Sequence, residues 1–308
     1  MTTTVLVLAG GPDPEHEVSL QSAKGIADAL ASTGEFRVHH RVIGALSQRD
    51  LAQLEGDVIF PALHGRWGEG GPLQQLLERD GRPFVGCGPR AARIAIDKVM
   101  SKTVAQTLGV RTSATAILDP GDTVMPLELP FVVKPIFEGS TIGLHICRTA
   151  AEWAHAHEQS AASRRPCLIE PFVRGRELTV GVIATESLDA LEALPVIQII
   201  PADGLYDYDA KYVRNDTQYV VGEGLPASVV EEVSRWTLAI AKRMGVRHLC
   251  RADYLLDDDN RAWFLEINTM PGFTSHSLVP MAARAAGVEM GALCARLVRA
   301  ALHEMSRA

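Results

Sequence analysis

The sequence predicts a mixed α/β and α+β protein, with a mainly parallel sheet in its N-terminal third. Three observations support this prediction. The chain has 308 residues, which is enough for two or three domains with their own cores. Up to about residue 90, short β-rich runs alternate with helical segments, the pattern typical of βαβ units. Beyond that point, strand-like runs follow one another with fewer helices between them.

In the N-terminal third we expect strands at residues 4–9, 36–43, 58–60 and 83–85. The expected helices lie at residues 18–30, 51–54 and 73–77. Gly10 and Gly11 follow the first strand, but the sequence has no G-x-G-x-x-G motif, so a dinucleotide site is not supported. It also has no G-x-x-x-x-G-K-[ST] motif, which excludes a P-loop as the nucleotide-binding device.

A small α+β domain is expected next, followed by longer strands. The elements expected in this domain are a helical region at 91–108, strands at 114–118, 131–134, 143–147 and 167–170, and a helix around 152–158. Further strands are expected at 178–185 and 193–201. A polar stretch, residues 203–217, then precedes a helix at 227–244, a hairpin and a last helix whose Leu293 and Leu297 belong to the core.

Composition and charge exclude several classes of protein. Hydrophobic residues make up 47% and the formal net charge is −7, so a broad cationic surface for nucleic acid is not expected. No apolar run approaches the ~20 residues that a membrane helix needs, so no membrane association is expected. The five cysteines are scattered and form no C-x-x-C pair, which favours a reducing compartment, by default the cytoplasm.

The predicted hairpin near residue 260 carries a candidate metal site. Arg251 and Asp253 share one face of the first strand, and Glu266 and Asn268 share one face of the second. An antiparallel register about the turn at 257–260 can bring Asp253 opposite Glu266. Two carboxylates and an amide oxygen suit Mg²⁺ that carries substrate phosphates. The alternative is an ordinary hairpin with a solvated outer face.

A second candidate site is a phosphate-binding loop. Lys134 ends a predicted strand, and the glycine-bearing segment 138–143 follows it. Small residues let backbone N–H groups approach phosphate oxygens, and the lysine adds a positive charge. The alternative is a surface hairpin turn. Lys98 is a candidate for a second phosphate cation, although by itself an ordinary surface lysine is favoured.

These motifs, in this order, resemble those of D-alanine–D-alanine ligases, which are members of the ATP-grasp superfamily. The resemblance extends from Leu6 to about Ala286. It is carried by Gly10-Gly11, Glu15-His16-Glu17-Val18-Ser19, His64-Gly65-x-x-Gly68-Glu69, Asp97-Lys98, Val133-Lys134-Pro135, Glu138-Gly139-Ser140, Gly175-Arg176-Glu177-Leu178-Thr179, Lys211-Tyr212, Arg251-x-Asp253, Glu266-Ile267-Asn268-Thr269-x-Pro271-Gly272 and Ser275-His276-Ser277. Each fragment alone is modest evidence, but so many fragments in this order are not expected by chance.

The resemblance implies a Rossmann-like N-terminal domain, 1–90, followed by a two-domain ATP-grasp fold, comprising a central domain, 91–176, and a C-terminal domain, 177–308. It implies ATP-dependent ligation of two D-alanine molecules through a D-alanyl phosphate, for peptidoglycan precursor synthesis. The implied cofactors are ATP and two Mg²⁺ ions, which Mn²⁺ could replace, and a homodimer is expected. The alternative is a D-alanine–D-lactate ligase or another ATP-grasp amino-acid ligase. Because depsipeptide-forming relatives tend to lose the tyrosine that matches Tyr212, its presence favours the dipeptide.

The resemblance also implies roles for individual residues. Those that would contact ATP are Lys98, Lys134, Glu170, Val173, Glu177 and Lys211, and those that would bind the metal are Asp253, Glu266 and Asn268. Those that would contact the D-alanines are Glu15, His64, Arg251, Ser277 and Leu278. The implied catalytic group comprises Glu15, Ser140, Tyr212, Arg251, Gly272 and Ser277. In this group Arg251 and the Gly272 N–H form the oxyanion hole, and Glu15, Ser140 and Tyr212 form one hydrogen-bonded network that closes a mobile lid.

The sequence departs from the family pattern at a few positions. Gly70 stands where the family commonly has Asp, and Pro171 stands where a lysine often contacts the adenine. Phe137 is bulkier than expected before the glycine loop. His155 and His157 could suggest a metal, but residues two apart on a helix point in different directions, so a solvated face is favoured.

Overall fold

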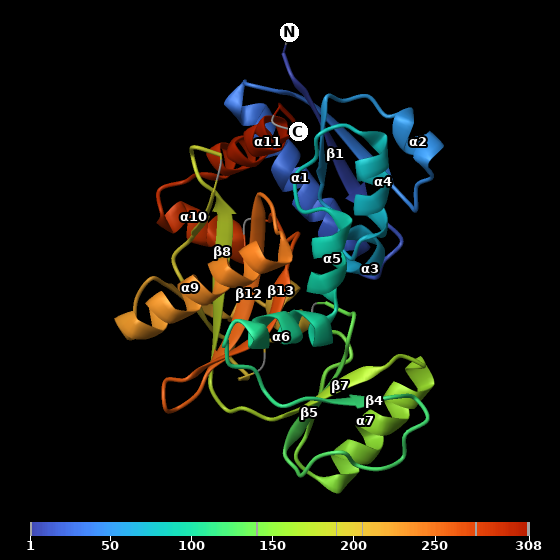
Figure 1. The fold of residues 1–308 in the computed structure, drawn as a ribbon, viewed down its shortest axis with the longest axis vertical. Coiled ribbons are helices and arrows are strands. Elements are labelled where there is room, and N and C mark those ends of the chain that lie inside the picture. The colour runs from blue at the N-terminus through green and yellow to red at the C-terminus, as the bar shows by residue number, and fades with distance from the viewer. Residues whose placement is uncertain (1, 140, 189, 205, 275, 307–308) are drawn as a thin grey trace.

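The computed structural model describes residues 2–139, 141–188, 190–204, 206–274 and 276–306. Its strands form three sheets, one in the N-terminal part, one in the middle and one in the C-terminal part of the chain (Figure 1). Helices accompany each sheet, so the predicted mixture of α/β and α+β structure is confirmed. The division of the chain at residues 90 and 176 stays a prediction.

The N-terminal sheet is parallel, as predicted. Its strands are β1 (Thr4–Gly10), β2 (Arg37–Ile43) and β3 (Val58–Pro61), with β1 in the centre. The apolar run from Val5 to Ala9 is fully buried, because helices cover both faces of a parallel sheet. The helices of this part are α1 (His16–Thr33), α2 (Gln48–Ala52), α3 (Gly65–Gly68) and α4 (Pro72–Asp80).

Two local predictions for this part were wrong in detail. The helix expected at 51–54 begins earlier, at Gln48, because Ser47 and Asp50 form a capping box, and it ends at Ala52. The strand expected at 83–85 makes only one isolated parallel bridge, between Phe84 and Ile59. Neither difference changes the order of the sheet.

The helical region expected at 91–108 is two helices, α5 (Pro89–Ile96) and α6 (Lys98–Thr107). Asp97 interrupts them with an extended backbone, φ −86° and ψ 105°. Its carboxylate accepts hydrogen bonds from the N–H groups of Val99 and Met100, at 2.9 and 3.0 Å, and so caps α6. The break places Lys98 at the first position of α6.

The central sheet is antiparallel, in the order β4-β7-β5-β6. Its strands are β4 (Ala116–Leu118), β5 (Phe131–Pro135), β6 (His145–Cys147) and β7 (Cys167–Pro171). The helix α7 (Ala150–Ser163) covers one face, where Phe131 packs edge to face on Trp153 with ring centroids 5.5 Å apart. The small α+β unit expected here is thus present.

The C-terminal sheet has the strand order β11-β10-β8-β12-β13, and β9 also pairs with β8. These strands are β8 (Arg176–Ala184), β9 (Leu191–Ala193), β10 (Ile197–Ile200), β11 (Gln218–Val221), β12 (Leu249–Leu256) and β13 (Ala262–Asn268). All pairings within it are antiparallel. The strand expected at 193–201 is split into β9 and β10, and Pro195, which has no N–H for a strand ladder, lies at the break.

Two helices, α8 and α9, lie between strands of this sheet along the chain. The helix α9 (Ala227–Met244) has the predicted bounds, and it ends at Gly245 in the left-handed conformation, φ 77°. The polar stretch 203–217 contains a short helix, α8 (Tyr208–Tyr212), which the sequence reasoning missed. Asp207 caps α8 by accepting a hydrogen bond from the N–H of Ala210 at 2.8 Å.

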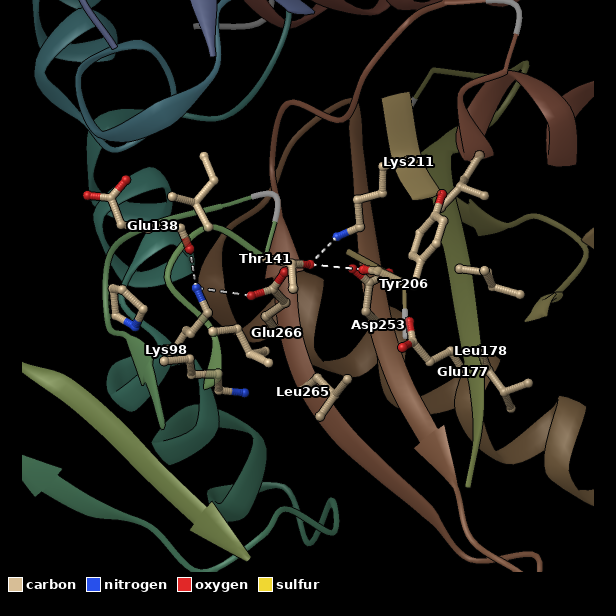
Figure 2. Close-up of a pocket in the computed structure, with 16 residues that line it drawn as sticks. Lys98, Glu138, Thr141, Glu177, Leu178, Tyr206, Lys211, Asp253, Leu265 and Glu266 are labelled. Carbon is tan, nitrogen blue, oxygen red and sulfur yellow. Dashed lines mark hydrogen bonds and ion pairs between the residues drawn. The ribbon is translucent and has the colours of Figure 1, made fainter. Parts of the chain in front are cut away.

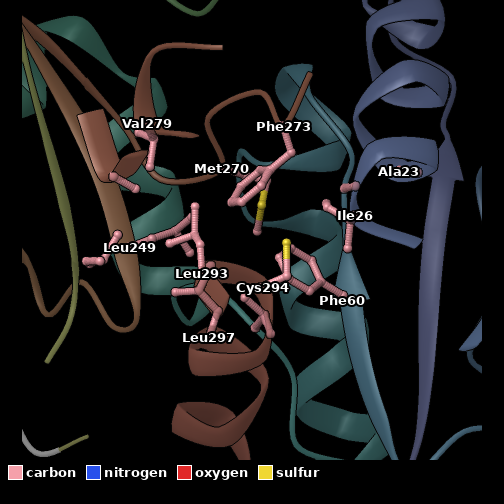
Figure 3. Close-up of a cluster of buried hydrophobic side chains, with 14 of the residues drawn as sticks. Ala23, Ile26, Phe60, Leu249, Met270, Phe273, Val279, Leu293, Cys294 and Leu297 are labelled. Atoms are coloured by element: carbon pink, nitrogen blue, oxygen red, sulfur yellow. The ribbon is translucent and has the colours of Figure 1, made fainter. Parts of the chain in front are cut away.

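The chain ends in α10 (Leu278–Ala285) and α11 (Met290–Ser306), and α11 packs against α1. Figure 3 shows the shared core, in which Leu293 and Leu297 of α11 lie near Ile26 of α1. Both leucines are fully buried, as predicted. No single helix in the described ranges is long and apolar enough to cross a membrane, although α10 and α11, bent by 104°, meet that criterion as a pair.

Candidate active site

Three adjoining cavities lie along the C-terminal sheet, where the central sheet and the loops of the N-terminal part meet it. The largest, about 640 Å³, is lined by Glu170, Val173 and Glu177 among others. The middle cavity, about 100 Å³, is lined by the residues drawn in Figure 2, which include Lys98, Lys134, Lys211, Asp253 and Glu266. The third, about 70 Å³, is lined by Glu15, His64, Arg251, Gly272, Ser277 and Leu278 among others.

The three cavities form one continuous site. Lys134, Glu177 and Leu265 line both the largest and the middle cavity. Lys211, Glu266 and Leu278 line both the middle and the third. The fold therefore brings predicted site residues together, although they are spread along the sequence from Glu15 to Leu278.

The β12–β13 hairpin has the predicted register. Asp253 lies opposite Glu266, and Arg251 lies opposite Asn268. Arg251 donates to both carboxylate oxygens of Asp253, from Nε at 3.0 Å and from Nη2 at 2.9 Å. Thr179 of the neighbouring strand β8 donates to the same carboxylate at 2.6 Å. These contacts fix Asp253 toward the middle cavity.

The second strand of the hairpin presents Glu266 and Asn268. The Nζ of Lys98 lies 3.1 Å from Glu266 Oε2. Burial alone would raise the pKa of Glu266, but Lys98, Lys211 and Lys134 outweigh burial and lower it, so this carboxylate is ionised. Asn268 Oδ1 accepts a hydrogen bond from the Met270 N–H at 2.8 Å. The donor set at this edge is two carboxylates and an amide oxygen, which fits a hard divalent cation.

The candidate phosphate lysines come from three separate elements. Lys98 begins α6 and donates to the Glu138 carbonyl at 2.6 Å, which ties it to the glycine loop. Lys134 is the penultimate residue of β5, with its Nζ 2.5 Å from Glu170 Oε2. Lys211 of α8 donates to Thr141 Oγ1 at 2.9 Å (Figure 2). Three cations thus converge on the middle cavity.

The 203–217 segment contacts the glycine loop. Thr141 donates to the Tyr206 carbonyl at 3.0 Å, and Lys211 Nζ lies 5.0 Å from the centre of the Tyr206 ring. Burial lowers the pKa of Lys211, while Glu266 opposes that effect. Tyr206 and Lys211 of this segment therefore line the middle cavity, and the role of the segment as a mobile lid stays a prediction.

The largest cavity contains the residues predicted to contact the nucleoside of ATP. Beside Glu170 it is lined by Pro171, Phe172 and Val173, and at its inner end by Glu177. Burial raises the pKa of Glu177 to about 7, and Lys211 only partly offsets it. The guanidinium of Arg148 lies 5.4 Å from the centre of the Phe172 ring and so covers one side of this pocket.

His64 is held by its surroundings on both ring nitrogens. Its Nδ1 lies 3.0 Å from the Met270 carbonyl and donates to it, while Nε2, 3.2 Å from Ser22 Oγ, accepts from that hydroxyl. Burial lowers the pKa of His64 to about 4. The ring is therefore neutral at pH 7 and contributes no positive charge to the third cavity.

Gly272 and Ser277 line the third cavity and lie close to each other. A Cβ at Gly272 would lie 2.9 Å from Ser277 Oγ, so only glycine fits here without displacing that hydroxyl. Ser277 Oγ accepts a hydrogen bond from the Thr274 N–H at 2.9 Å. Ser277 is the N-cap of α10, and Leu278 is the first residue of that helix.

Two predicted residues cannot be placed. Ser140 lies outside the described residues, and so does the side chain of Tyr212, so the network predicted for them with Glu15 stays a prediction. Glu15 itself is buried, and it is the residue that immediately precedes α1. At Gly70, where the family commonly has Asp, an added Cβ would lie 2.3 Å from the Arg66 carbonyl, so the local turn has no room for a side chain.

Sequence reasoning missed several residues that hold this site. Thr179, Thr141 and Tyr206 lie within motifs or segments noted in the sequence, but no role was predicted for their hydrogen bonds. Lys102 is a fully buried lysine whose ammonium forms an ion pair with Glu170. Its position, one helical turn after Lys98, is a signal that could have identified it.

Solved structures show which class of protein has this architecture. The D-alanine–D-alanine ligase from Coxiella burnetii has a TM-score of 0.83 at 22% identity, covering 99% of this chain and 96% of that one. The ATP complex of the D-alanine–D-alanine ligase from Bacillus anthracis has a TM-score of 0.82 at 27% identity, covering 100% and 99%. The fold is therefore the ATP-grasp fold, and the protein is an enzyme of the ATP-dependent ligase class.

The sequence comparisons identify the family. A family model described as the D-ala D-ala ligase C-terminus matches residues 112–299. The D-alanine–D-alanine ligase of Bordetella petrii is 42% identical over 296 residues, which cover 95% of this chain and 90% of that protein. The chain belongs to the D-alanine–D-alanine ligase family. The family, fold and enzyme class predicted from the sequence are confirmed.

Proposed function

We propose that this enzyme joins two D-alanine molecules into D-alanyl-D-alanine, a precursor of peptidoglycan, and converts ATP to ADP and phosphate. The observation that carries the proposal is the middle cavity. There three lysines, Lys98, Lys134 and Lys211, face the paired carboxylates Asp253 and Glu266. Cations for a triphosphate and anions for its metal are the two parts that phosphoryl transfer needs.

ATP would lie along the largest and the middle cavities. Lys98 and Lys134 would hold the phosphates, and Lys211 would reach the γ-phosphate from the segment that covers them. Glu170 and the backbone of Val173 would meet the adenine edge, and Glu177 would accept hydrogen bonds from the ribose hydroxyls. Pro171 has no side-chain donor, so the contact that a lysine makes with adenine in many relatives is absent here.

Asp253, Glu266 and Asn268 would hold the divalent metal that ligases of this class use with ATP. The proposed number is two Mg²⁺ ions, and Mn²⁺ could replace them because it also accepts oxygen ligands. When bound, the ions would neutralise charge on the phosphoryl group. Arg251 and Lys98 now contact Asp253 and Glu266, so they hold both carboxylates in place.

The third cavity would bind the two D-alanines. Glu15 would pair with the ammonium of the first D-alanine, and the neutral His64 would pack near its carboxylate. Ser277 and Leu278 would receive the carboxylate of the second D-alanine, and Arg251 would also contact it. Ser140 and Tyr212 are proposed to join Glu15 in closing the site.

The reaction would proceed in two steps. A carboxylate oxygen of the first D-alanine attacks the γ-phosphorus, the bond to the ADP oxygen breaks, and a D-alanyl phosphate forms. The neutral amine of the second D-alanine then attacks the acyl carbon and loses a proton, and phosphate leaves. The Arg251 guanidinium and the Gly272 N–H would stabilise the oxyanion of the tetrahedral intermediate.

The test measures the release of phosphate from ATP in the presence of Mg²⁺ and each member of a panel of D- and L-amino acids and D-lactate. The mass of each product is then determined. We expect release with D-alanine and a product of the mass of D-alanyl-D-alanine. A faster reaction with D-lactate as the second substrate, or with an L-amino acid, would contradict the proposal. We further propose that the protein is a homodimer, and light scattering of the purified protein can test this by measuring its molecular mass. We also propose that it works in the cytoplasm and binds neither nucleic acid nor membrane.

A further inference from the structure

Lys102 of α6 is a buried lysine that the proposed reaction does not use. Its side chain is 2% exposed, and it forms an ion pair with Glu170 Oε1. Its Nζ also donates to the Phe264 carbonyl of β13 at 3.3 Å. Placing an ammonium group away from water costs free energy, so a buried lysine needs strong compensating contacts.

The two lysines of α6 reach the ATP site at different points. Lys98 and Lys102 are four residues apart, so they lie on the same face of the helix one turn apart. Lys98 contacts Glu266 of the C-terminal sheet, and Lys102 contacts Glu170 of the central sheet. The helix therefore links the two walls of the cleft through both ammonium groups.

Glu170 binds one lysine on each carboxylate oxygen. Oε2 lies 2.5 Å from Lys134 Nζ, and Oε1 pairs with Lys102. Burial would raise the pKa of Glu170, but Lys134 and Lys102 outweigh it and lower it. Burial lowers the pKa of Lys102 to about 8, against the opposing effect of Glu170, so Lys102 is charged at pH 7.

The charge count of this trio decides how strongly it attracts phosphate. With Lys102 present, two ammonium groups face one carboxylate, and the trio carries a net charge of +1. Without Lys102, Glu170 and Lys134 would cancel each other. Lys134 lines the middle cavity, and Lys102 does not. The surplus charge is thus supplied from behind the cavity wall.

We propose that Lys102 is a positioning residue for ATP: it neutralises Glu170, so that the charge of Lys134 remains available to the triphosphate. It also fixes the Glu170 carboxylate from the side opposite to Lys134, which sets the orientation that Glu170 presents to the nucleoside cavity. This inference rests on the proposed binding of the ATP phosphates at Lys134.

The first test compares Lys102→Met, which keeps the length of the side chain, with the wild type. We expect the KM for ATP to rise about tenfold, while kcat and the KM for D-alanine change less than about threefold. Lys102→Arg restores the charge and should return the KM for ATP to within about threefold of wild type. Lys24→Met, which removes the exposed partner of the Asp28 ion pair on α1, is the matched control.

The second test is independent of whether Lys102→Met folds. Binding of a non-hydrolysable ATP analogue with Mg²⁺ is measured between pH 6.5 and 9.5 in the wild type and in Lys102→Arg. The groups facing Lys102 are Glu170 on β7, Lys134 on β5 and Glu266 on β13. Because arginine stays protonated throughout this range, we expect the wild type to lose affinity above about pH 8 and Lys102→Arg to lose less.

The outcomes separate the two proposals. If the wild type does not bind the analogue at all, the proposed function fails. If the wild type and Lys102→Met bind the analogue equally well, the role of Lys102 is refuted and the proposed function stands. The same conclusion follows if the wild type and Lys102→Arg lose affinity for the analogue in parallel above pH 8. A lower melting temperature in Lys102→Met without a change in the KM for ATP would indicate a structural role alone.

Discussion

Replacing Glu177 by glutamine should stabilise the protein at alkaline pH and weaken ATP binding. Glu177 lines both the largest and the middle cavity, and burial raises its pKa from an ordinary 4.5 to about 7. A carboxyl group with this shift prefers to be protonated in the folded protein. Ionising it at pH 8 therefore destabilises the fold, and glutamine cannot ionise.

The size of the effect follows from the pKa difference. At a pH above both pKa values, a rise from 4.5 to about 7 corresponds to about 3 kcal/mol of lost stability. The side chain is partly exposed, so solvent screening reduces this to about 2 kcal/mol. The stabilising contribution of the protonated group is complete below pH 4.5, and it is lost as the pH rises through 7. Glu177→Gln should therefore melt about 3 °C above wild type at pH 8.5, and at about the same temperature at pH 4.5.

The assay is a melting curve of the ligand-free protein at both pH values, with the exposed Glu223→Gln as control. The same variant should show a KM for ATP raised about tenfold, because a charged acceptor for the ribose hydroxyls is lost. Equal melting temperatures of wild type and Glu177→Gln at pH 8.5 would refute the reasoning about burial. An unchanged KM for ATP would refute the ribose contact.

Three further predictions concern the metal site and the segment that covers it. Asp253→Asn or Glu266→Gln should lower kcat by ~10²-fold or more with little change in melting temperature. The control Asp258→Asn, in the turn of the same hairpin, should leave kcat unchanged. Wild-type turnover in either Asp253→Asn or Glu266→Gln would contradict the metal assignment. Hydrogen exchange of residues 203–217 should slow when ATP and D-alanine bind, and equal exchange with and without ligands would count against a closing lid. Tyr212→Phe should raise the share of depsipeptide when D-lactate competes with D-alanine, and a constant product ratio across pH would exclude this role.

The β12–β13 hairpin could be predicted because most of its information is local. Strand side chains alternate, and a short polar turn at 257–260 brings Asp253 close to Glu266, but their direct pairing also depends on a register shift between Asp253 and Tyr254 that the sequence does not reveal. The parallel N-terminal sheet was predictable for a similar reason, since alternation of strands and helices is visible along the chain. The assignment of nucleotide and substrate roles needed the resemblance to a family.

Features that depend on distant contacts could not be predicted. A single lysine such as Lys102 has the same sequence signature whether it lies on the surface or in the core, and only the approach of Glu170 from β7 decides this. The break between α5 and α6 depends on one extended residue, Asp97, within a continuous helical pattern. The helix α8 is five residues long, too short for a periodic signal.

The core shared by the two ends of the chain has a consequence for synthesis on the ribosome. The apolar face of α1, which includes Ile26 and Leu30, is covered in part by Leu293 and Leu297 of α11. At ~5–20 residues per second, on the order of ten seconds or more pass between emergence of the first helix and arrival of the last. During that time α11 does not yet cover the apolar face of α1. The nascent chain should therefore be a substrate for a chaperone until α11 has left the ribosome, and packing of α11 on α1 should end that dependence.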